Sequence, residues 1–545
     1  MKQTFDRGDG KLVLAHVIFA FAALLIGGIA GMLQGMVRSG MVTLPANIGY
    51  YELLTAHGVL MALIFTTYFI IGFLYSGVSN TLGGRLYPLT RKLGWLGYLT
   101  MSVGTIIGVV VILLGKATVL YTFYAPMKAS PWFYIALALV VIGSWLSGFG
   151  IFHQYSRWRA ENQGKLSPLF AFMSVVTMLM WQIATIGVAI EVVVQLIPWS
   201  FGWVDTINVV LSRTLFWYFG HPLVYFWLLP AYICWYVVIP KIIGGRIFSD
   251  SLARLSFILF LLFSIPVGFH HQLMEPGISG FWKFLQVVLT FMVIVPSLMT
   301  AFSMFATFEM NGRAKGAKGL FGWLKVLPWK DVRFFAPFMG MLVFIPAGAG
   351  GIINASNQMN AVVHNTLWVT GHFHLTVATS VALTFFGIIY WLIPTVTGRV
   401  LTPKMNKLGI IQTLIWCVGM LFMSGSMHTV GLMGDPRRTA YTTYDDHPDA
   451  VLWMPYHVAM AIGGMILFVG VILIVYNMFA LMRAPKGETE YPIGQVSEES
   501  EPTPRFLERW GIWLGLAVAL ILFAYTIPLI DMLNNTVNSP GYVTW

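Results

Sequence analysis

The sequence predicts an all-α integral membrane protein, a bundle of about 13 transmembrane helices whose N-terminus is cytoplasmic. Three observations predict this class: the composition, a series of long apolar runs, and the placement of Lys and Arg. The 545 residues are 57% hydrophobic and only 10% charged, with a mean hydropathy of +0.76. These proportions lie outside the range of a water-soluble chain of this length, so a soluble globular protein is excluded.

Apolar runs of about 20 residues, the length that crosses a bilayer as a helix, recur along the whole chain. The first run is too long for a signal peptide and has no small-residue cleavage site, so we expect it to remain as a helix. We expect one membrane domain over 1–545, with 12 core spans and an additional C-terminal span. The predicted spans lie near residues 11–37, 51–78, 93–115, 131–153, 167–197, 209–240, 252–272, 281–308, 333–352, 361–393, 407–432, 452–482 and 508–533.

The basic residues predict the orientation, because Lys and Arg of short loops are retained on the cytoplasmic side. When successive loops are assigned to alternate sides, 25 of the 32 Lys and Arg residues fall on one side, which includes the N-terminus. The net charge of +11 therefore reflects membrane topology, and we expect no nucleic-acid partner. The hydrophilic stretch 483–508, which contains GETEYPIGQVSEESEPTPR, is predicted to be a solvated connector.

Metal chemistry in this chain has to come from histidine. Both cysteines, Cys234 and Cys417, lie inside apolar runs, which excludes a disulfide framework and a Cys-rich metal cluster. Ionisable side chains at membrane depth are costly and usually functional. A lone histidine in a span is also often an interhelical hydrogen-bonding residue, and we place His16, His153, His428 and His457 in that class. Six others fall in the outer half of four predicted spans: His57, His221, His270, His271, His372 and His374.

His372 and His374, in TGHFHLTV, are two residues apart on the predicted tenth span. Successive helical residues are turned by ~100°, so these side chains point to nearly opposite faces and cannot bind one metal from a regular helix. We expect them to serve two sites. His57 lies at a depth where it completes a two-histidine ligation of one heme with His374. His372 then carries a second heme with one axial position open, which binding of a diatomic gas requires.

Three further histidines predict a copper site. His270 and His271, in PVGFHHQ, come just after Pro266, where irregular backbone lets both rings converge. His221, in FGHPLVYFW, lies in the outer half of the sixth span. Three imidazoles suit a copper ion with a vacant position. The sequence therefore predicts two hemes and one copper in the outer half of the bundle.

These motifs resemble those of subunit I of heme-copper oxidases, and more closely those of the B family of bacterial and archaeal oxidases. The resemblance covers the chain from the second span onward and includes AHGVLMA, GHPLVYFWLLPAY, PVGFHHQ, PSLMTAF, VVHNTLWVTGHFHL and DPRR. It implies the catalytic subunit of a terminal respiratory oxidase, which reduces O2 to water at a heme-copper centre and translocates protons.

The resemblance also assigns the ligands and cofactors. It implies that His57 and His374 ligate a low-spin heme, which we expect to be b-type. It implies that His372 ligates a high-spin heme of a or o type, and that the copper, CuB, is held by His221, His270 and His271. We expect a bacterial or archaeal plasma membrane location, a partner subunit II with a CuA domain, and electrons from cytochrome c; a quinol donor stays open.

Tyr225 follows His221 by four residues and shares its helix face. By the resemblance it corresponds to the family's tyrosine that is cross-linked to a copper-ligand histidine. Cleaving O2 without releasing partly reduced oxygen needs four electrons at once, and a phenol beside the metals can supply one electron and one proton. We therefore assign catalytic roles to Tyr225 and His221. The alternative, an interfacial aromatic residue, fits poorly with the depth of Tyr225.

A line of hydroxyls is predicted to lead protons inward to this site. Tyr225, Tyr232 and Tyr236 recur at i, i+7 and i+11, which keeps them on one helical stripe. Ser249, Thr300 and Ser303 lie at depths suited to continue it, although such hydroxyls also commonly bond the backbone. The resemblance favours a path, because B-family enzymes use a single channel of this kind, and A-family enzymes have Glu at the position of Leu223. No step is assigned to Glu191, a further membrane carboxyl.

Outer-face charges are predicted to bind the heme propionates. Arg437 and Arg438 belong to the outer minority of basic residues, and paired guanidiniums can clamp carboxylates. Asn360 and His364 are four residues apart on the predicted tenth span, outward of the heme ligands. Family members often have Asp in place of Asn360, so we expect His364 to carry more of any proton-loading role.

Two other functions compete with this interpretation. A nitric oxide reductase of the same superfamily shares the histidines but typically has a non-heme iron with nearby glutamates, and GHPLVYFW has no carboxylate. A proton-coupled transporter with histidine relays predicts no heme, and it gives no reason for histidines two residues apart to face separate cofactors.

Overall fold

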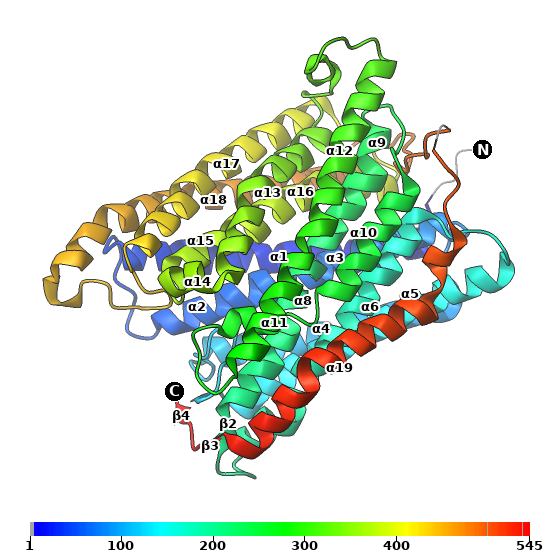
Figure 1. Ribbon diagram of the computed structural model, residues 1–545. Helices are drawn as coiled ribbons and strands as arrows, with labels where there is room; N and C mark the ends of the chain where they lie inside the picture. The colour runs from blue at the N-terminus through cyan, green and yellow to red at the C-terminus, as the bar shows by residue number, and fades with distance from the viewer. Residues whose placement is uncertain (1–4, 499, 537, 545) are drawn as a thin grey trace.

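The computed structural model describes residues 5–498, 500–536 and 538–544, and these form a bundle of long helices (Figure 1). Within this part of the chain, 12 helical stretches are long and apolar enough to cross a membrane. The single helices among them are α1 (Arg7–Arg38), α4 (Pro88–Leu113), α5 (Pro131–Glu161), α13 (Val332–Ala355), α17 (Pro403–Leu432), α18 (Pro448–Arg483) and α19 (Trp510–Asn535).

The other five stretches are interrupted helices. Four contain a π-helical turn, an element that is frequent at functional sites. The stretch without a π-helical turn consists of α11 (Gly280–Met292) and α12 (Ile294–Ala314). The four with one are α2 (Tyr50–Gly58), η1 (Val59–Phe65) and α3 (Thr66–Thr81); α6 (Leu169–Ile190), η2 (Glu191–Leu196) and α7 (Ile197–Phe201); α8 (Val209–Ile233), η3 (Cys234–Val238) and α9 (Ile239–Ile242); and α15 (Leu367–Leu375), η6 (Thr376–Val381) and α16 (Ala382–Thr397).

The seventh predicted span, 252–272, is not a continuous helix. It consists of α10 (Asp250–Phe263) and the 3-10 segment η4 (Gly268–Gln272). Pro266 has no N–H to donate and disfavours helical geometry in the residue before it, so the helix ends there. Helix α10 packs against α6 and α12 inside the bundle.

The predicted tenth span also begins differently from the prediction. Asn360 lies on a separate short helix, α14 (Asn357–Val363), and His364 follows its end. Asn365 has a φ of 59°, a left-handed conformation that Asn tolerates, and Thr366 caps the start of α15 by accepting from Trp368 N. The placement of Asn360 and His364 on the tenth helix was therefore wrong.

The outer surface of the bundle is apolar, as a lipid-facing surface must be. Leu113, Ile106 and Leu421 are 67%, 58% and 73% exposed on α4 and α17. The two chain ends lie at opposite ends of the bundle in Figure 1. Together these features bear out the predicted all-α integral membrane fold.

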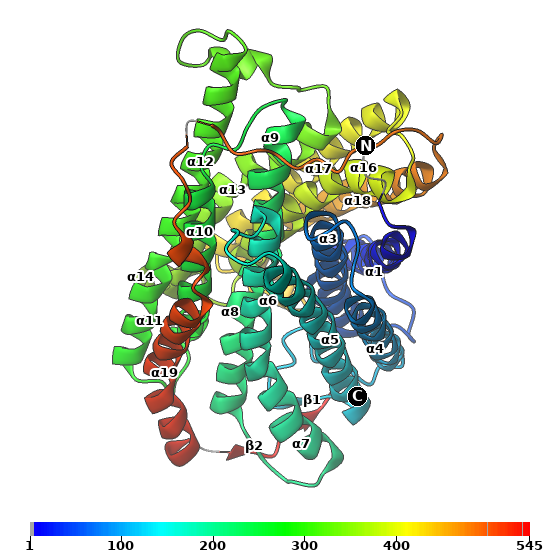
Figure 2. The same cartoon turned by 90° about the vertical axis from the view of Figure 1, so that its right-hand side faces the viewer.

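The C-terminal part of the chain runs along one side of the molecule. The segment after α18 passes over the bundle and ends in η8 (Arg505–Glu508), and α19 then lies beside α10 and α11 (Figures 1 and 2). Two short strand pairs follow: β4 (Tyr542–Val543) pairs in parallel with β1 (Met127–Lys128), and β3 (Asn538–Ser539) pairs antiparallel with β2 (Ile207–Asn208). The remaining 3-10 segments are η5 (Gly322–Val326) and η7 (Tyr444–Asp446).

Candidate active site

His57 and His374 face each other across a cavity between α2 and α15. Their ring centroids are 6.1 Å apart and their planes differ by 8°. The Nδ1 atoms of His57 and His374 donate to the carbonyl oxygens of Gly27 (2.9 Å) and Thr370 (2.8 Å), so each Nε2 is left to accept. With metal–nitrogen bonds of about 2.0 Å and about 1 Å from each nitrogen to its ring centre, this spacing fits one metal ion between them.

The cavity around this pair is large and mostly apolar. Methionine and phenylalanine side chains line it, and Arg437 and Arg438 are among its few charged lining residues. Gly31 is required beside His57, because a Cβ there would lie 2.5 Å from His57 Nδ1. An apolar slot with two opposed histidines and two guanidiniums fits a planar dicarboxylic macrocycle such as heme.

His372 lies on the other side of α15, in a second cavity. That cavity also contains His221, His270, His271 and Tyr225. Phe373, Val377 and Arg437 line both cavities, so the two sites are neighbours that share one helical wall. The structure thus separates His372 from His374 as the two-residue spacing predicts.

His221, His270 and His271 form a cluster in which one ring nitrogen from each lies within 4.8 Å of the others. His221 Nδ1 is 3.1 Å from His271 Nε2. His271 also stacks on Trp217, with centroids 3.8 Å apart and planes 3° apart. Within the described residues this is the one group of three or more His, Cys, Asp or Glu side chains arranged to hold a metal ion. Three convergent imidazoles, of which those of His221 and His270 are buried, fit a copper ion with an open position.

Tyr225 faces the same cavity from α8. Its ring centroid is 4.7 Å from that of His221, at 64°, and its ring also packs on Phe260 of α10. The four-residue spacing on a helix accounts for the contact with His221. The phenol is therefore next to the histidine cluster.

The predicted line of hydroxyls is only partly connected. Tyr236 OH donates to Thr300 Oγ1 at 3.1 Å and lies 3.3 Å from Ser256 Oγ. Ser303 Oγ is buried and has no hydrogen-bond partner among the residues that the structure describes. Ser249 has a different role, because its side chain caps α10 by accepting from Leu252 N.

Tyr232 lies between Tyr225 and Tyr236 on the same stripe, and its ring packs against Trp235, Phe260 and Phe344. The sequence reasoning missed Ser256 and Ser297. Ser297 lines the cavity that holds Tyr225. A hydroxyl inside an apolar helix, two residues after Arg254, was the available signal for Ser256, but only the packing of α10 on α12 shows which face it occupies.

The outer arginines, Arg437 and Arg438, are half-buried and keep unpaired donor nitrogens. Arg437 Nε and Arg438 Nη2 have no hydrogen-bond partner within the described chain, while Arg437 Nη2 donates to Asn365 Oδ1 at 2.9 Å. Burial and the neighbouring charge of Arg438 lower the pKa of Arg437 to about 10. Arg437 lines both cavities and Arg438 lines the first, and two half-buried cations with unpaired donors fit the carboxylates of a heme.

His364 and Asn360 interact although they are not on the tenth helix. His364 Nδ1 is 3.1 Å from Asn360 Oδ1, and both residues line the second cavity. Burial, with the positive charges of Arg437 and Lys283, lowers the pKa of His364 to about 4.

The segment that carries the arginines is fixed by a buried ionic cluster that the sequence reasoning did not identify. Asp435 accepts from Arg38 Nη2 at 3.2 Å, and its Oδ2 is 2.7 Å from His457 Nε2. The backbone oxygen of Asp435 also accepts from Leu367 N, the first residue of α15. These contacts join α1, α18 and the DPRR segment to the helix that carries His372 and His374. Glu191 lies apart from both cavities, with its Oε1 bonded by Ser212 Oγ at 2.8 Å.

Residues 11–466 match the protein family described as cytochrome c and quinol oxidase polypeptide I. The chain belongs to this family. It is 40% identical to cytochrome c oxidase subunit 1 of Thermus thermophilus, over 98% of this chain and 97% of the relative. A probable quinol oxidase subunit 1 of Staphylococcus haemolyticus is 26% identical, over 90% of this chain and 72% of that protein.

A solved structure agrees with these relatives. A cryo-EM structure of a heme-copper terminal oxidase dimer superposes with a TM-score of 0.92 and is 36% identical, covering 98% of this chain and 95% of that one. The chain is therefore the catalytic subunit of a terminal respiratory oxidase, an enzyme that contains hemes and copper and associates with other oxidase subunits. The transporter alternative is excluded.

Proposed function

We propose that this oxidase subunit reduces O2 to water in the second cavity, between His372 and the cluster of His221, His270 and His271. The observation that supports this most directly is the shared cavity of one isolated histidine, three clustered histidines and Tyr225. His372 would hold the high-spin heme and the cluster would hold CuB. His57 and His374 would hold the low-spin heme in the first cavity.

The hemes and copper supply electrons to O2 and bind it when they are present. The chain's own residues orient these groups and handle protons. His221 and Tyr225 are the catalytic residues, because the phenol of Tyr225 lies beside His221 and can give one electron and one proton. Reduction of one O2 to two waters uses four electrons and four protons, so protons must reach Tyr225 from the inner side.

The proton path would pass along Tyr236, Tyr232 and Tyr225. The bond from Tyr236 to Thr300 supports its inner part, and Ser256 extends it. Ser303 is buried close by, on the same helix as Thr300. The side chain of Ser249 caps α10, so it would contribute to the entrance of the path only through a bridging water.

We assign the chain to the B family, because Leu223 stands where A-family enzymes have Glu and one path of hydroxyls leads inward. Translocated protons would be released near the heme propionates. Arg437 and Arg438 would bind these carboxylates, with His364 and Asn360 beside them. We expect His364, with a pKa lowered to about 4 by burial and by nearby cations, to take a proton only when a propionate offsets those charges.

Electrons would come from cytochrome c through a subunit II with a CuA domain. Neither cysteine of this chain can form such a site, since Cys234 and Cys417 lie within the helix bundle. The higher identity to a cytochrome c oxidase than to quinol oxidases supports this donor. We further propose a bacterial or archaeal plasma membrane location, a b-type low-spin heme, an a- or o-type high-spin heme, and one membrane domain over 1–545.

Heme and metal analysis of the purified complex tests these assignments. We expect a low-spin heme, a high-spin heme and copper in this subunit. His270→Gln should lower the copper content and leave the low-spin heme spectrum unchanged, whereas His374→Ala should abolish that spectrum. A non-heme iron in place of copper would instead indicate a nitric oxide reductase.

A further inference from the structure

The backbone just before His270 is buried but belongs to no regular helix. Helix α10 ends at Phe263, and Ile265, Val267 and Phe269 are fully buried in the turn that leads to η4. Backbone N–H and C=O groups that are buried outside a helix must find other partners, because leaving them unpaired is costly. Two of these bonds lie within the turn, from Val267 N to Ile265 O and from His270 N to Val267 O, and further partners come from two other helices.

Helix α19 supplies the first partner through Tyr525. The Tyr525 hydroxyl accepts from Gly268 N at 2.9 Å and donates to the Ile265 carbonyl oxygen at 3.3 Å. The contact is close, because a Cβ on Gly268 would lie 2.6 Å from the Tyr525 oxygen. The Tyr525 ring packs edge-on against Phe269. One side chain of α19 thus holds both sides of the turn.

Helix α11 supplies the second partner through Gln286. Its Oε1 accepts from Phe269 N at 2.8 Å, and its Nε2 donates to the Ala524 carbonyl oxygen of α19 at 3.2 Å. Gln286 therefore joins α19 to the residue that directly precedes His270.

The same helix α11 orients the His270 ring. Thr290 Oγ1 donates to the Gln286 carbonyl oxygen at 2.6 Å and lies 3.0 Å from His270 Nδ1. Since the threonine proton is used on Gln286, the hydroxyl accepts from His270 Nδ1–H, which leaves Nε2 free to bind a metal. Gln286 and Thr290 of α11 therefore hold both the backbone before His270 and the Nδ1 side of its ring, and Tyr525 of α19 holds the same turn.

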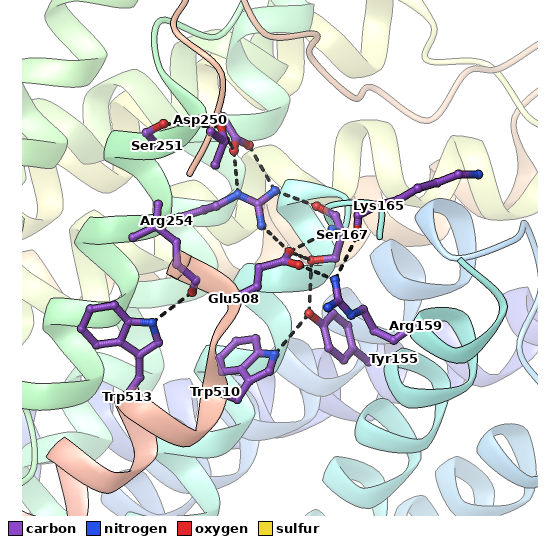
Figure 3. A network of polar contacts seen from close by, with 12 residues as sticks. Tyr155, Arg159, Lys165, Ser167, Asp250, Ser251, Arg254, Glu508, Trp510 and Trp513 are labelled. Carbon is purple, nitrogen blue, oxygen red and sulfur yellow. Dashed lines mark hydrogen bonds and ion pairs between the residues drawn. The ribbon is translucent and has the colours of Figure 1, made fainter. Parts of the chain in front are cut away.

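Both ends of α19 are anchored, so its middle can act as a fixed support. At its start, Glu508 accepts from Arg254, Arg159 and Ser167 (Figure 3). At its end, the Met532 carbonyl oxygen accepts from Asn208 Nδ2 at 2.9 Å. Helix α19 lies beyond residue 466, where the family match ends.

We propose that α19 is a brace for the copper-binding segment, and that Tyr525 and Gln286 are positioning residues for His270 and His271. The inference rests on the proposed copper ligation by these histidines. Their hydrogen bonds hold the turn in the one conformation that directs both rings toward His221. Loss of either bond frees a buried backbone N–H and loosens the ligand geometry.

Copper retention in the whole oxidase complex tests the brace. Tyr525→Phe removes the hydroxyl alone, and Gln286→Met removes the amide at nearly constant volume. We expect each variant to bind copper 10–100-fold more weakly, the range typical of residues that orient metal ligands. The readouts are copper bound per low-spin heme at graded chelator concentrations and the optical spectrum of each heme.

Tyr218→Phe is the matched control. The Tyr218 ring packs on Tyr525 with centroids 5.1 Å apart, but within the described residues its hydroxyl has no hydrogen bond to the turn. If both variants retain as much copper as the control, the proposed role of α19 as a brace is wrong. It is also wrong if copper is lost only together with both hemes, because that result indicates general unfolding. Absence of copper from the unaltered complex would instead overturn the proposed ligation.

Discussion

Replacing Glu508 by Gln is expected to release the start of α19 from the bundle. The side chain of Glu508 is only 3% exposed and bonds two cations, Arg254 at 2.8 Å and the partly exposed Arg159. It also accepts from Ser167 N at 2.8 Å and from Ser167 Oγ. All of these contacts join η8 to α5, α10 and the segment before α6 (Figure 3).

The expected cost follows from the charges that lose their partner. Breaking a buried ion pair on one side costs about 3–5 kcal/mol. The lower end applies here, because Arg254 keeps Asp250 at 2.6 Å and Arg159 can reach water. A loss of ~3 kcal/mol in the local opening free energy raises the population of the undocked state about 100-fold.

Amide hydrogen exchange of the complex in detergent measures this opening. We expect exchange about 100-fold faster at Ser167 and across 503–510, with little change in the middle of α8. Glu501→Gln is the control, since that carboxylate is exposed on the same connector. Exchange at Ser167 within about twofold of the control would refute a stabilising role for the Glu508 cluster.

Three further substitutions follow from the site. Tyr225→Phe should lower O2 turnover by about 100-fold or more while both hemes and copper are retained, because the phenol supplies a proton and an electron beside His221. His270→Gln should lower copper content at least tenfold and leave the low-spin heme spectrum unchanged, as measured by metal analysis and absorbance. Tyr236→Phe should slow proton uptake about 100-fold, because it breaks the bond to Thr300.

These predictions share a control and have distinct contrary results. Tyr75→Phe removes a buried hydroxyl that bonds Ser147 O, away from both cavities, and should leave turnover, metals and proton uptake unchanged. Full turnover of Tyr225→Phe would contradict a role for the phenol. Retention of copper by His270→Gln would exclude that histidine as a ligand, and unchanged proton uptake in Tyr236→Phe would place the path elsewhere.

Much of the fold could be predicted because spans and helix faces follow from local rules. Apolar run length located 12 long helices, and the two-residue spacing of His372 and His374 predicted their separation into two cavities. The start of the predicted tenth span could not be placed, since the left-handed conformation of Asn365 depends on its tertiary surroundings. No apolar pattern distinguishes such a break from continuous helix.

The residues that position the metal ligands were harder to predict than the ligands themselves. Histidines at membrane depth stand out in composition, but Thr290, Gln286 and Tyr525 are ordinary residues of apolar helices. Their roles come from contacts of η4 with α11 and α19, which only the tertiary structure brings together. Likewise, His457 was assigned only to interhelical hydrogen bonding. Its partner Asp435, which also accepts from Arg38, lies in a loop whose position depends on the packing of α1 and α18.

The most direct test of the central claim is the ratio of electrons consumed to O2 consumed by the purified complex, with copper and both hemes quantified in the same sample. We expect four electrons per O2, no release of hydrogen peroxide, and loss of this activity in Tyr225→Phe. Consumption of nitric oxide without O2 reduction, or an O2 reaction that releases peroxide in the unaltered complex, would contradict that claim.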